Sequence, residues 1–160
     1  MLRGGGRSGF NGGSVVEVDV RNSEMGFTLR EGTLGKITFV NSNVDVNFAS
    51  SNIKEIHIIN CKGMVDLTLY KANIETLQIS NCPVNELVTT AAIIQNFSIE
   101  KSTVVNSEYK RMKVKNLTLT DVSFDQKNDF SGAQVENLTT KNVTKLPGLN
   151  LILTDSNVKF

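Results

Sequence analysis

The chain has 160 residues, enough for one domain with a single core. Seventeen basic and sixteen acidic side chains leave a net charge of +1. Such a chain has no overall field to attract phosphate backbones, so nucleic acid is not an expected partner. No apolar run is long enough to span a membrane, and no charged start leads into the apolar core of a secretory signal. We expect a protein that is cytoplasmic or exported without a classical signal peptide, and the composition indicates no cofactor.

The first fourteen residues are rich in glycine. Residues 1–14 hold six of the twelve glycines, a composition typical of a flexible coil. Gly4, Gly6 and Gly9 match the spacing of a dinucleotide-binding loop, but such a loop must follow a strand and open a helix. We therefore expect a flexible tail or linker over residues 1–14 and a single folded domain over residues 15–160.

One unit recurs from Val15 onward with a period of about twenty residues. It has an aliphatic residue, two variable residues, an apolar residue, one variable residue and a further apolar residue. Asn or Asp and a small residue usually follow. No single copy could bury its apolar side alone, so the period indicates one supersecondary unit stacked on itself. The copies begin at Val15, Leu34, Ile53, Ile74, Ile94, Val114 and Val135.

A finer repeat of about five residues lies inside each unit. An apolar residue recurs at this spacing, which fits neither a helix nor a long strand. It does fit a chain that makes a short strand, turns a corner and repeats, so that four sides make one coil. The sequence therefore predicts an all-β fold, a parallel β-helix of about seven four-sided coils over residues 15–160.

Two stretches carry this pattern most clearly, Phe130-Ser-Gly-Ala133-Gln-Val135 and Leu69-Tyr-Lys-Ala72-Asn-Ile74. In each, a small residue stands two positions before an apolar centre. The pattern resembles that of pentapeptide-repeat proteins over residues 15 to about 143, and this resemblance implies a right-handed quadrilateral β-helix like that of some bacterial secreted effectors. One side in four differs from the family pattern because it carries large residues, at Val18, Ile37, Ile56, Leu77, Phe97, Leu117 and Leu138.

A leucine-rich-repeat solenoid is the alternative fold. The segment from Ile74 to Leu87 satisfies the spacing L-x-x-L-x-L-x-x-C-x-L-x-x-L. In that fold the second half of a unit forms a helix or an extended turn, and a helical turn is plausible over residues 85–94. The strand-like second halves Met25–Leu29 and Val44–Phe48 favour the β-helix.

Two columns of polar or small residues have structural interpretations. Asn and Asp tolerate left-handed turns and bond to nearby backbone, so a structural ladder at one corner is predicted, with Lys101 interrupting it. A neighbouring column of small residues is expected to point inward. The ladder comprises Asn22, Asn41, Asn60, Asn81, Asp121 and Asn142, and the inward column comprises Ser23, Ser42, Cys61, Cys82 and Ser102.

The sequence contains two cysteines and a single histidine, residue types that can carry chemistry. Cys61 and Cys82 fall at equivalent positions of neighbouring coils, within disulfide range but poorly aimed for bonding, so we expect reduced, buried thiols and no metal site. His57 is predicted on an outer surface between Thr38 and Gln78, with no carboxylate stacked beside it. We therefore predict no catalytic residue.

Charged side chains suggest two surface features. Asp66 and Glu86 occupy similar outward positions on successive coils, with Asp45 and Asp125 near the same column. A solvated face is the simpler interpretation, and a carbohydrate site is the functional one. A thin basic strip is predicted across the next corner, at Arg30, Lys71, Lys110 and Arg111.

The ends of a β-helix expose unpaired backbone that native proteins cover. Neither terminus shows an amphipathic helix, and the register is lost after Val143. We therefore predict a non-enzymatic scaffold or protein-interaction module that binds a protein partner or itself through its ends, within a longer bacterial effector or surface protein. The alternatives are a carbohydrate-binding or carbohydrate-active β-helix using Asp66 and Glu86, and a topoisomerase-inhibiting pentapeptide-repeat protein. The last acts as an acidic DNA mimic, which a charge of +1 disfavours.

Overall fold

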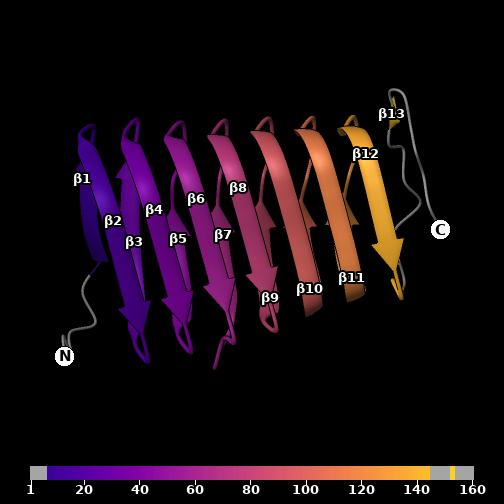
Figure 1. Cartoon of the computed structure of the whole chain (residues 1–160), viewed down its shortest axis with the longest axis horizontal. Helices are drawn as coiled ribbons and strands as arrows, with labels where there is room; N and C mark the ends of the chain where they lie inside the picture. Colours follow the sequence, from indigo (N-terminus) through magenta and orange to yellow (C-terminus); the bar gives the residue numbers. More distant parts are fainter. Residues whose placement is uncertain (1–6, 145–151, 154–160) are drawn as a thin grey trace.

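The computed structural model describes residues 7–144 and 152–153, which form one parallel sheet wound into a solenoid of about six turns (Figure 1). The described residues contain no helix, so none of them forms a helix that could cross a membrane. The thirteen strands are β1 (Arg7–Asn11), β2 (Ser14–Arg21), β3 (Glu24–Arg30), β4 (Thr33–Val40), β5 (Asn43–Asn47), β6 (Asn52–Ile59), β7 (Val65–Thr68), β8 (Asn73–Ser80), β9 (Pro83–Val88), β10 (Ile93–Glu108), β11 (Lys113–Asp129), β12 (Gln134–Lys141) and β13 (Ile152–Leu153).

The predicted parallel solenoid is confirmed, and the leucine-rich-repeat alternative is wrong. Strand β9, a turn and the start of β10 occupy residues 85–94, where that alternative placed a helical turn. The described residues make about six turns, where the sequence predicts about seven coils over residues 15–160. The expected loss of register after Val143 and the C-terminal part of the predicted domain fall largely on residues 145–151 and 154–160, which lie outside the described ranges.

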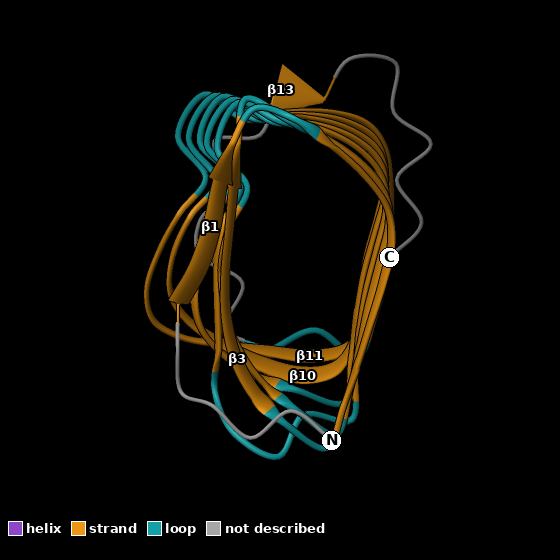
Figure 2. Cartoon of the chain, turned by 90° about the vertical axis from the view of Figure 1, so that its left-hand side faces the viewer, coloured by secondary structure: helices purple, strands orange, loops and turns teal. Residues whose placement is uncertain are grey.

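The twenty-residue period sets the register of the stack. The first residue of each unit pairs directly with the first residue of the next, from Val15 with Leu34 to Val114 with Val135. Strands β2, β4, β6, β8, β12 and the first halves of β10 and β11 form one long side. Seen along the solenoid axis, the coils superpose (Figure 2).

The core fills the inside of this stack. Along β6 the burial alternates, with Ile56 and Ile58 fully buried and His57 between them half-exposed. Like residues of successive coils stack at the strand spacing of about 4.8 Å, so each inward column packs on itself. The column of large residues is buried at 4 % exposure or less from Ile37 to Leu138, whereas Val18 in the first coil is only partly buried.

Two columns of left-handed residues make two of the corners. Every residue of the predicted Asn/Asp ladder has φ between 52° and 55°, and Lys101 in the same column has φ 48°. Amide side chains bond along this ladder, for example Asn81 Nδ2 to Asn60 Oδ1 at 3.0 Å. Sequence reasoning missed the second column, which comprises Glu31, Ser50, Lys71, Ala91, Arg111 and Gly132.

The expectation of a flexible segment over residues 1–14 is wrong for the second half of that range. Strand β1 pairs in parallel with β3 over all five of its residues, and β2 begins at Ser14. A ladder uses backbone N–H and C=O groups, so a glycine-rich composition does not prevent pairing. Gly12 and Gly13 supply the turn between the strands, with φ of 71° and 110°. Residues 1–6 lie outside the described ranges.

Candidate functional site

The predicted pair of carboxylates does lie on neighbouring strands. Asp66 of β7 pairs in register with Glu86 of β9 on one side and with Asp45 of β5 on the other. These three acidic side chains line a shallow depression of about 350 Å³, whose rim includes Asn47. Asp125 lies two coils beyond Glu86, in register with Val105 of β10, so the acidic column is interrupted.

Asp66 is held in place by a hydrogen bond from a neighbouring coil. It is half-buried, and its Oδ1 accepts a hydrogen bond from Asn85 Nδ2 at 2.8 Å, whereas Glu86 is exposed. Carboxylates and amides of this kind can bind sugar hydroxyls, and hydrolysis would further require one carboxyl to act as an acid. No group of three or more His, Cys, Asp and Glu within the described residues is placed to hold a metal ion.

His57 lies where the sequence places it, between Thr38 of β4 and Gln78 of β8. Its Nδ1 lies 3.0 Å from Gln78 Oε1, and its Nε2 lies 3.0 Å from Oε2 of Glu55 on the same strand. This hydrogen bond holds the pKa of Glu55 below its usual range. Sequence reasoning missed Glu55, because residue 54 stands outside the strand register and leaves both Glu55 and His57 facing outward.

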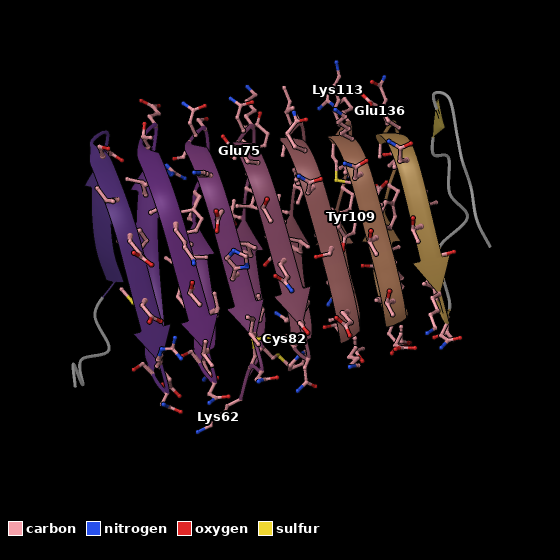
Figure 3. All side chains as sticks on the ribbon, viewed as in Figure 1. Lys62, Glu75, Cys82, Tyr109, Lys113 and Glu136 are labelled. Carbon is pink, nitrogen blue, oxygen red and sulfur yellow. A yellow bond between two sulfur atoms is a disulfide. The ribbon has the colours of Figure 1, made fainter. Side chains whose placement is uncertain are left out.

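Cys61 and Cys82 form a disulfide that joins the third and fourth coils (Figure 3). The expectation of reduced thiols is therefore wrong. Stacking in the same inward column brings the two Cα atoms to 4.8 Å, and the side chains can then turn toward each other. Cys82 is buried and Cys61 is half-buried, beside the turn that exposes Met64.

The inward small column also binds the backbone of the previous coil. Ser42 Oγ accepts from Ser23 N at 3.3 Å and donates to Val40 O at 2.9 Å. Ser102 Oγ accepts from Cys82 N at 3.2 Å in the same way. These hydroxyls accept hydrogen bonds from backbone N–H groups at the corner that have no partner in the β-sheet ladder. This explains why small polar residues occur inside an apolar stack.

The basic strip is partly neutralised. Lys110 Nζ lies 3.4 Å from both Glu108 Oε1 and Asp129 Oδ2, and these carboxylates raise the pKa of Lys110. Lys71 Nζ stands 5.0 Å from the centre of the Tyr70 ring. Arg30 and Arg111 are exposed in equivalent corner regions of other coils. These basic residues therefore make separate contacts at the corners and do not form one continuous positive surface.

Within the described residues, the N-terminal end of the solenoid is only half covered. Strand β1 lies on β3 there, while β2 pairs with β4 and with no other strand of the described residues (Figure 1). Inward-facing Val15 and Val18 are only partly buried, whereas their stacked counterparts one coil further on are at most 1 % exposed. Val16, at the corner of β2, is 83 % exposed.

The C-terminal end is better covered. Strand β13 pairs with the start of β12, at Gln134 and Val135. Val135 is fully buried and Leu138 is 4 % exposed. Sequence reasoning treated the two ends alike and missed this difference, because it depends on which short segments pair beyond the regular repeat.

No family model and no curated protein matches the sequence. One solved structure is similar over 92 % of both chains, with 11 % sequence identity and a TM-score of 0.32: QnrB1, described as a plasmid-mediated fluoroquinolone resistance protein. A likeness this weak supports no statement about activity. The fold of this chain stands on its own strand registers.

Proposed function

We propose that this protein is an interaction module that associates with other polypeptides through the N-terminal end of its solenoid. The observation that carries this proposal is the unequal cover of the two ends. Val15, Val18 and Met25 are partly buried at the N-terminal end, while at the other end Val135 and Leu138 are buried and Val143 is partly buried. Uncovered apolar side chains beside an unpaired strand edge favour association with a further chain.

Light scattering after size-exclusion chromatography tests this proposal on the full chain. We expect the isolated protein to self-associate as its concentration rises, because the uncovered end has no other partner in solution. Val16→Lys should suppress the larger species, since a charge at an edge opposes pairing. Lys54 and Lys115 occupy the equivalent corner in other coils, so the substitution is compatible with the fold.

Thr118→Lys provides the matched control. Thr118 is exposed on the long side of the sixth coil, so Thr118→Lys adds the same charge far from the N-terminal end. We expect Thr118→Lys to associate like the parent chain. A chain that stays monomeric at every concentration, or that responds equally to both substitutions, would show that the N-terminal end is not an association surface.

Carbohydrate binding is a second candidate, supported by the depression of about 350 Å³ at Asp45, Asp66 and Glu86. Exposed carboxylate and amide side chains at such a depression can accept hydrogen bonds from sugar hydroxyls. Titration calorimetry with a panel of soluble oligosaccharides tests this idea. Binding that is lost in the Asp66→Asn, Glu86→Gln double variant would support it, and no heat with any sugar would contradict it.

A further inference from the structure

The two halves of the Cys61–Cys82 disulfide differ in their exposure to solvent. Cys82 is 3 % exposed, whereas Cys61 is only half-buried and stands directly before the exposed Lys62 (Figure 3). A thiol from solution must reach the sulfur that it attacks, so access decides which sulfur of a disulfide reacts. Cys61 is therefore the accessible half of this pair.

The sulfur of Cys82 occupies the place that a serine hydroxyl holds elsewhere in the inward small column. It accepts a hydrogen bond from Cys61 N at 3.3 Å, just as Ser102 Oγ accepts from Cys82 N at 3.2 Å. It also lies 3.3 Å from Ser80 O, and Ser102 Oγ donates to the equivalent carbonyl, Glu100 O, at 2.7 Å. A reduced Cys82 thiol can therefore stay in place, because it finds both a backbone donor and a carbonyl acceptor there.

The sulfur of Cys61 is not held in this way. Within the described residues it bonds to Cys82 Sγ but accepts no hydrogen bond from Ser42 N, the equivalent backbone group one coil earlier. The chain after it is also irregular, because Val65 comes four positions after Cys61. One coil earlier, Val44, the register partner of Val65, comes only two positions after Ser42. Cys82 is thus held by the column, whereas Cys61 adjoins a longer and more exposed corner.

The corner around the disulfide carries a single charge, and that charge is positive. Residues 60–64 and 81–83 contain no acidic side chain, and their one charged residue, Lys62, is exposed. The attacking form of a thiol is the thiolate, which is an anion. A positive charge beside Cys61 therefore favours the approach of an anionic thiol over that of a thiol that carries a positive group.

We propose that Cys61 is a site of reversible thiol exchange, at which a small anionic thiol forms a mixed disulfide and from which Cys82 displaces it again. Three observations carry this proposal: the greater exposure of Cys61, the serine-like hydrogen bonds that keep Cys82 in place, and the positive charge of Lys62. The site is separate from the N-terminal end of the solenoid, since the disulfide joins the third and fourth coils.

The exchange needs no reactant besides the thiol. In the forward step the thiolate sulfur attacks Cys61 Sγ and forms a new S–S bond there, while the bond between Cys61 and Cys82 breaks. Cys82 leaves with the electron pair of the broken bond and takes a proton from water. In the reverse step the Cys82 thiolate attacks Cys61 Sγ and expels the small thiol as its thiolate. One disulfide replaces another in each direction, so the exchange involves no net oxidation or reduction.

Two single-cysteine variants of the full chain test the assignment of Cys61. Cys82→Ser keeps a hydroxyl in the column and leaves the Cys61 thiol free, while Cys61→Ser leaves only the buried Cys82 thiol. Oxidised glutathione should modify folded Cys82→Ser and should modify folded Cys61→Ser about tenfold more slowly or less, because a buried thiol reacts only when the structure opens locally. Intact-protein mass spectrometry measures both rates. In urea, where both chains are unfolded, the two rates should be equal.

The parent chain tests the exchange itself, without a variant that must fold. Reduced glutathione is added to the folded, disulfide-bonded protein, and N-ethylmaleimide stops the reaction at early times by blocking the free thiols. Cleavage after Lys62 then places the two cysteines on separate peptides for mass spectrometry. We expect glutathione on the peptide of Cys61 and the maleimide on that of Cys82.

A pair of lysine substitutions tests the preference for an anionic thiol. Lys62→Glu should slow the attack by glutathione about two- to fivefold, the size expected for exposed charges, and should not slow the attack by cysteamine, which carries an ammonium group. Lys113→Glu is the matched control, because it makes the same change of charge at the opposite edge of the solenoid (Figure 3). Both rates should stay unchanged in Lys113→Glu.

Several outcomes would overturn the proposal. Glutathione on Cys82, or in equal amounts on both cysteines, would show that Cys61 is not the accessible sulfur, and equal rates for the two folded single-cysteine variants would show the same. A parent disulfide that reacts with glutathione only in urea would be a fixed cross-link. An unchanged rate with glutathione in Lys62→Glu would contradict the preference for an anionic thiol. Light scattering decides the association of the N-terminal end independently, so the two proposals can fail separately.

Discussion

The Cys61–Cys82 disulfide shows how much one residue pair can change in a stacked fold. Both residues belong to a column in which serine is the usual member, and Ser42 and Ser102 flank them in the same column. The cross-link closes a loop of about twenty residues between adjacent coils, so it restricts the unfolded chain without altering the packing pattern.

Replacing both cysteines by serine isolates the effect of the cross-link. Serine suits this column, so the Cys61→Ser, Cys82→Ser variant should fold but lose about 3 kcal/mol of unfolding free energy, the value expected for a loop of this length. Urea unfolding measures the loss. A reducing agent should shift the parent midpoint toward that of the variant and leave the variant unchanged. Thiol titration of the unfolded, unreduced parent should find no free thiol.

Tyr109 is a buried polar residue that stacks between Thr89 and Phe130 in one inward column. Its ring stacks on Phe130 at 4.1 Å, and its hydroxyl has no hydrogen-bond partner among the described residues. The nearby Ser107 hydroxyl already accepts from Leu87 N and donates to Val105 O. Burial raises the pKa of the Tyr109 phenol, so the folded state holds it neutral.

Tyr109→Phe should therefore stabilise the protein. Removing an unpaired buried hydroxyl while keeping the ring should raise the unfolding free energy by about 1 kcal/mol at neutral pH. The folded phenol binds its proton more tightly than the unfolded one, so the parent should lose about 1.4 kcal/mol per pH unit above about pH 10. The variant should lose less over that range in chemical unfolding. A lower midpoint for Tyr109→Phe would show that the hydroxyl is paired.

At the scale of single strands, β6 carries an interaction between two side chains on its outward face. The two side chains, Glu55 and His57, both point outward, and the hydrogen bond from His57 lowers the pKa of Glu55. A carboxyl whose pKa is lowered on folding stabilises the fold above its ordinary pKa, and this contribution disappears as the pH falls through the lowered value. In His57→Gln, an NMR titration should find the Glu55 pKa closer to its ordinary value. An unchanged titration would mean that His57 does not hold the carboxylate.

Two residues of the second corner column allow opposite substitutions that test the cost of a left-handed turn. Ala91 has φ 58° and Gly132 has φ 67° at equivalent corners, and only glycine adopts this region without cost. Ala91→Gly should raise the unfolding free energy by about 0.5 to 1 kcal/mol, and Gly132→Ala should lower it by a similar amount. Space does not limit the second change, because an added Cβ would approach only Arg111 Cγ at 3.4 Å. Thermal unfolding of both variants checks the opposite signs.

The regular parts of this fold could be predicted from the sequence, and the irregular parts could not. The pairing of Val15 with Leu34 and the left-handed turn at Asn60 follow from the apolar period and from backbone stereochemistry, which act within one unit. The Cys61–Cys82 bond depends on how two side chains turn. Strand β1 depends on backbone pairing that glycine-rich composition does not reveal, and the uneven ends follow from that pairing.

At the scale of the whole molecule, stability should vary along the solenoid. Each coil contacts only its neighbours, so an end coil has one stabilising interface where an inner coil has two. The N-terminal coil also leaves Val15 and Val18 partly exposed, whereas the disulfide joins the third and fourth coils near the middle.

Hydrogen exchange should therefore report a gradient that is slowest in the centre. We expect amides of β6 and β8 to exchange by the slowest openings, those of β4 to be faster, and those of β1 and β2 to be the fastest of the N-terminal half. Reduction of the disulfide should speed exchange most in β6 and β8, because it removes the constraint that joins their coils. Native-state exchange with mass spectrometry resolves these strands. Uniform protection from β2 to β8 would mean that the solenoid opens as one unit and that its N-terminal coil is as firmly held as its centre.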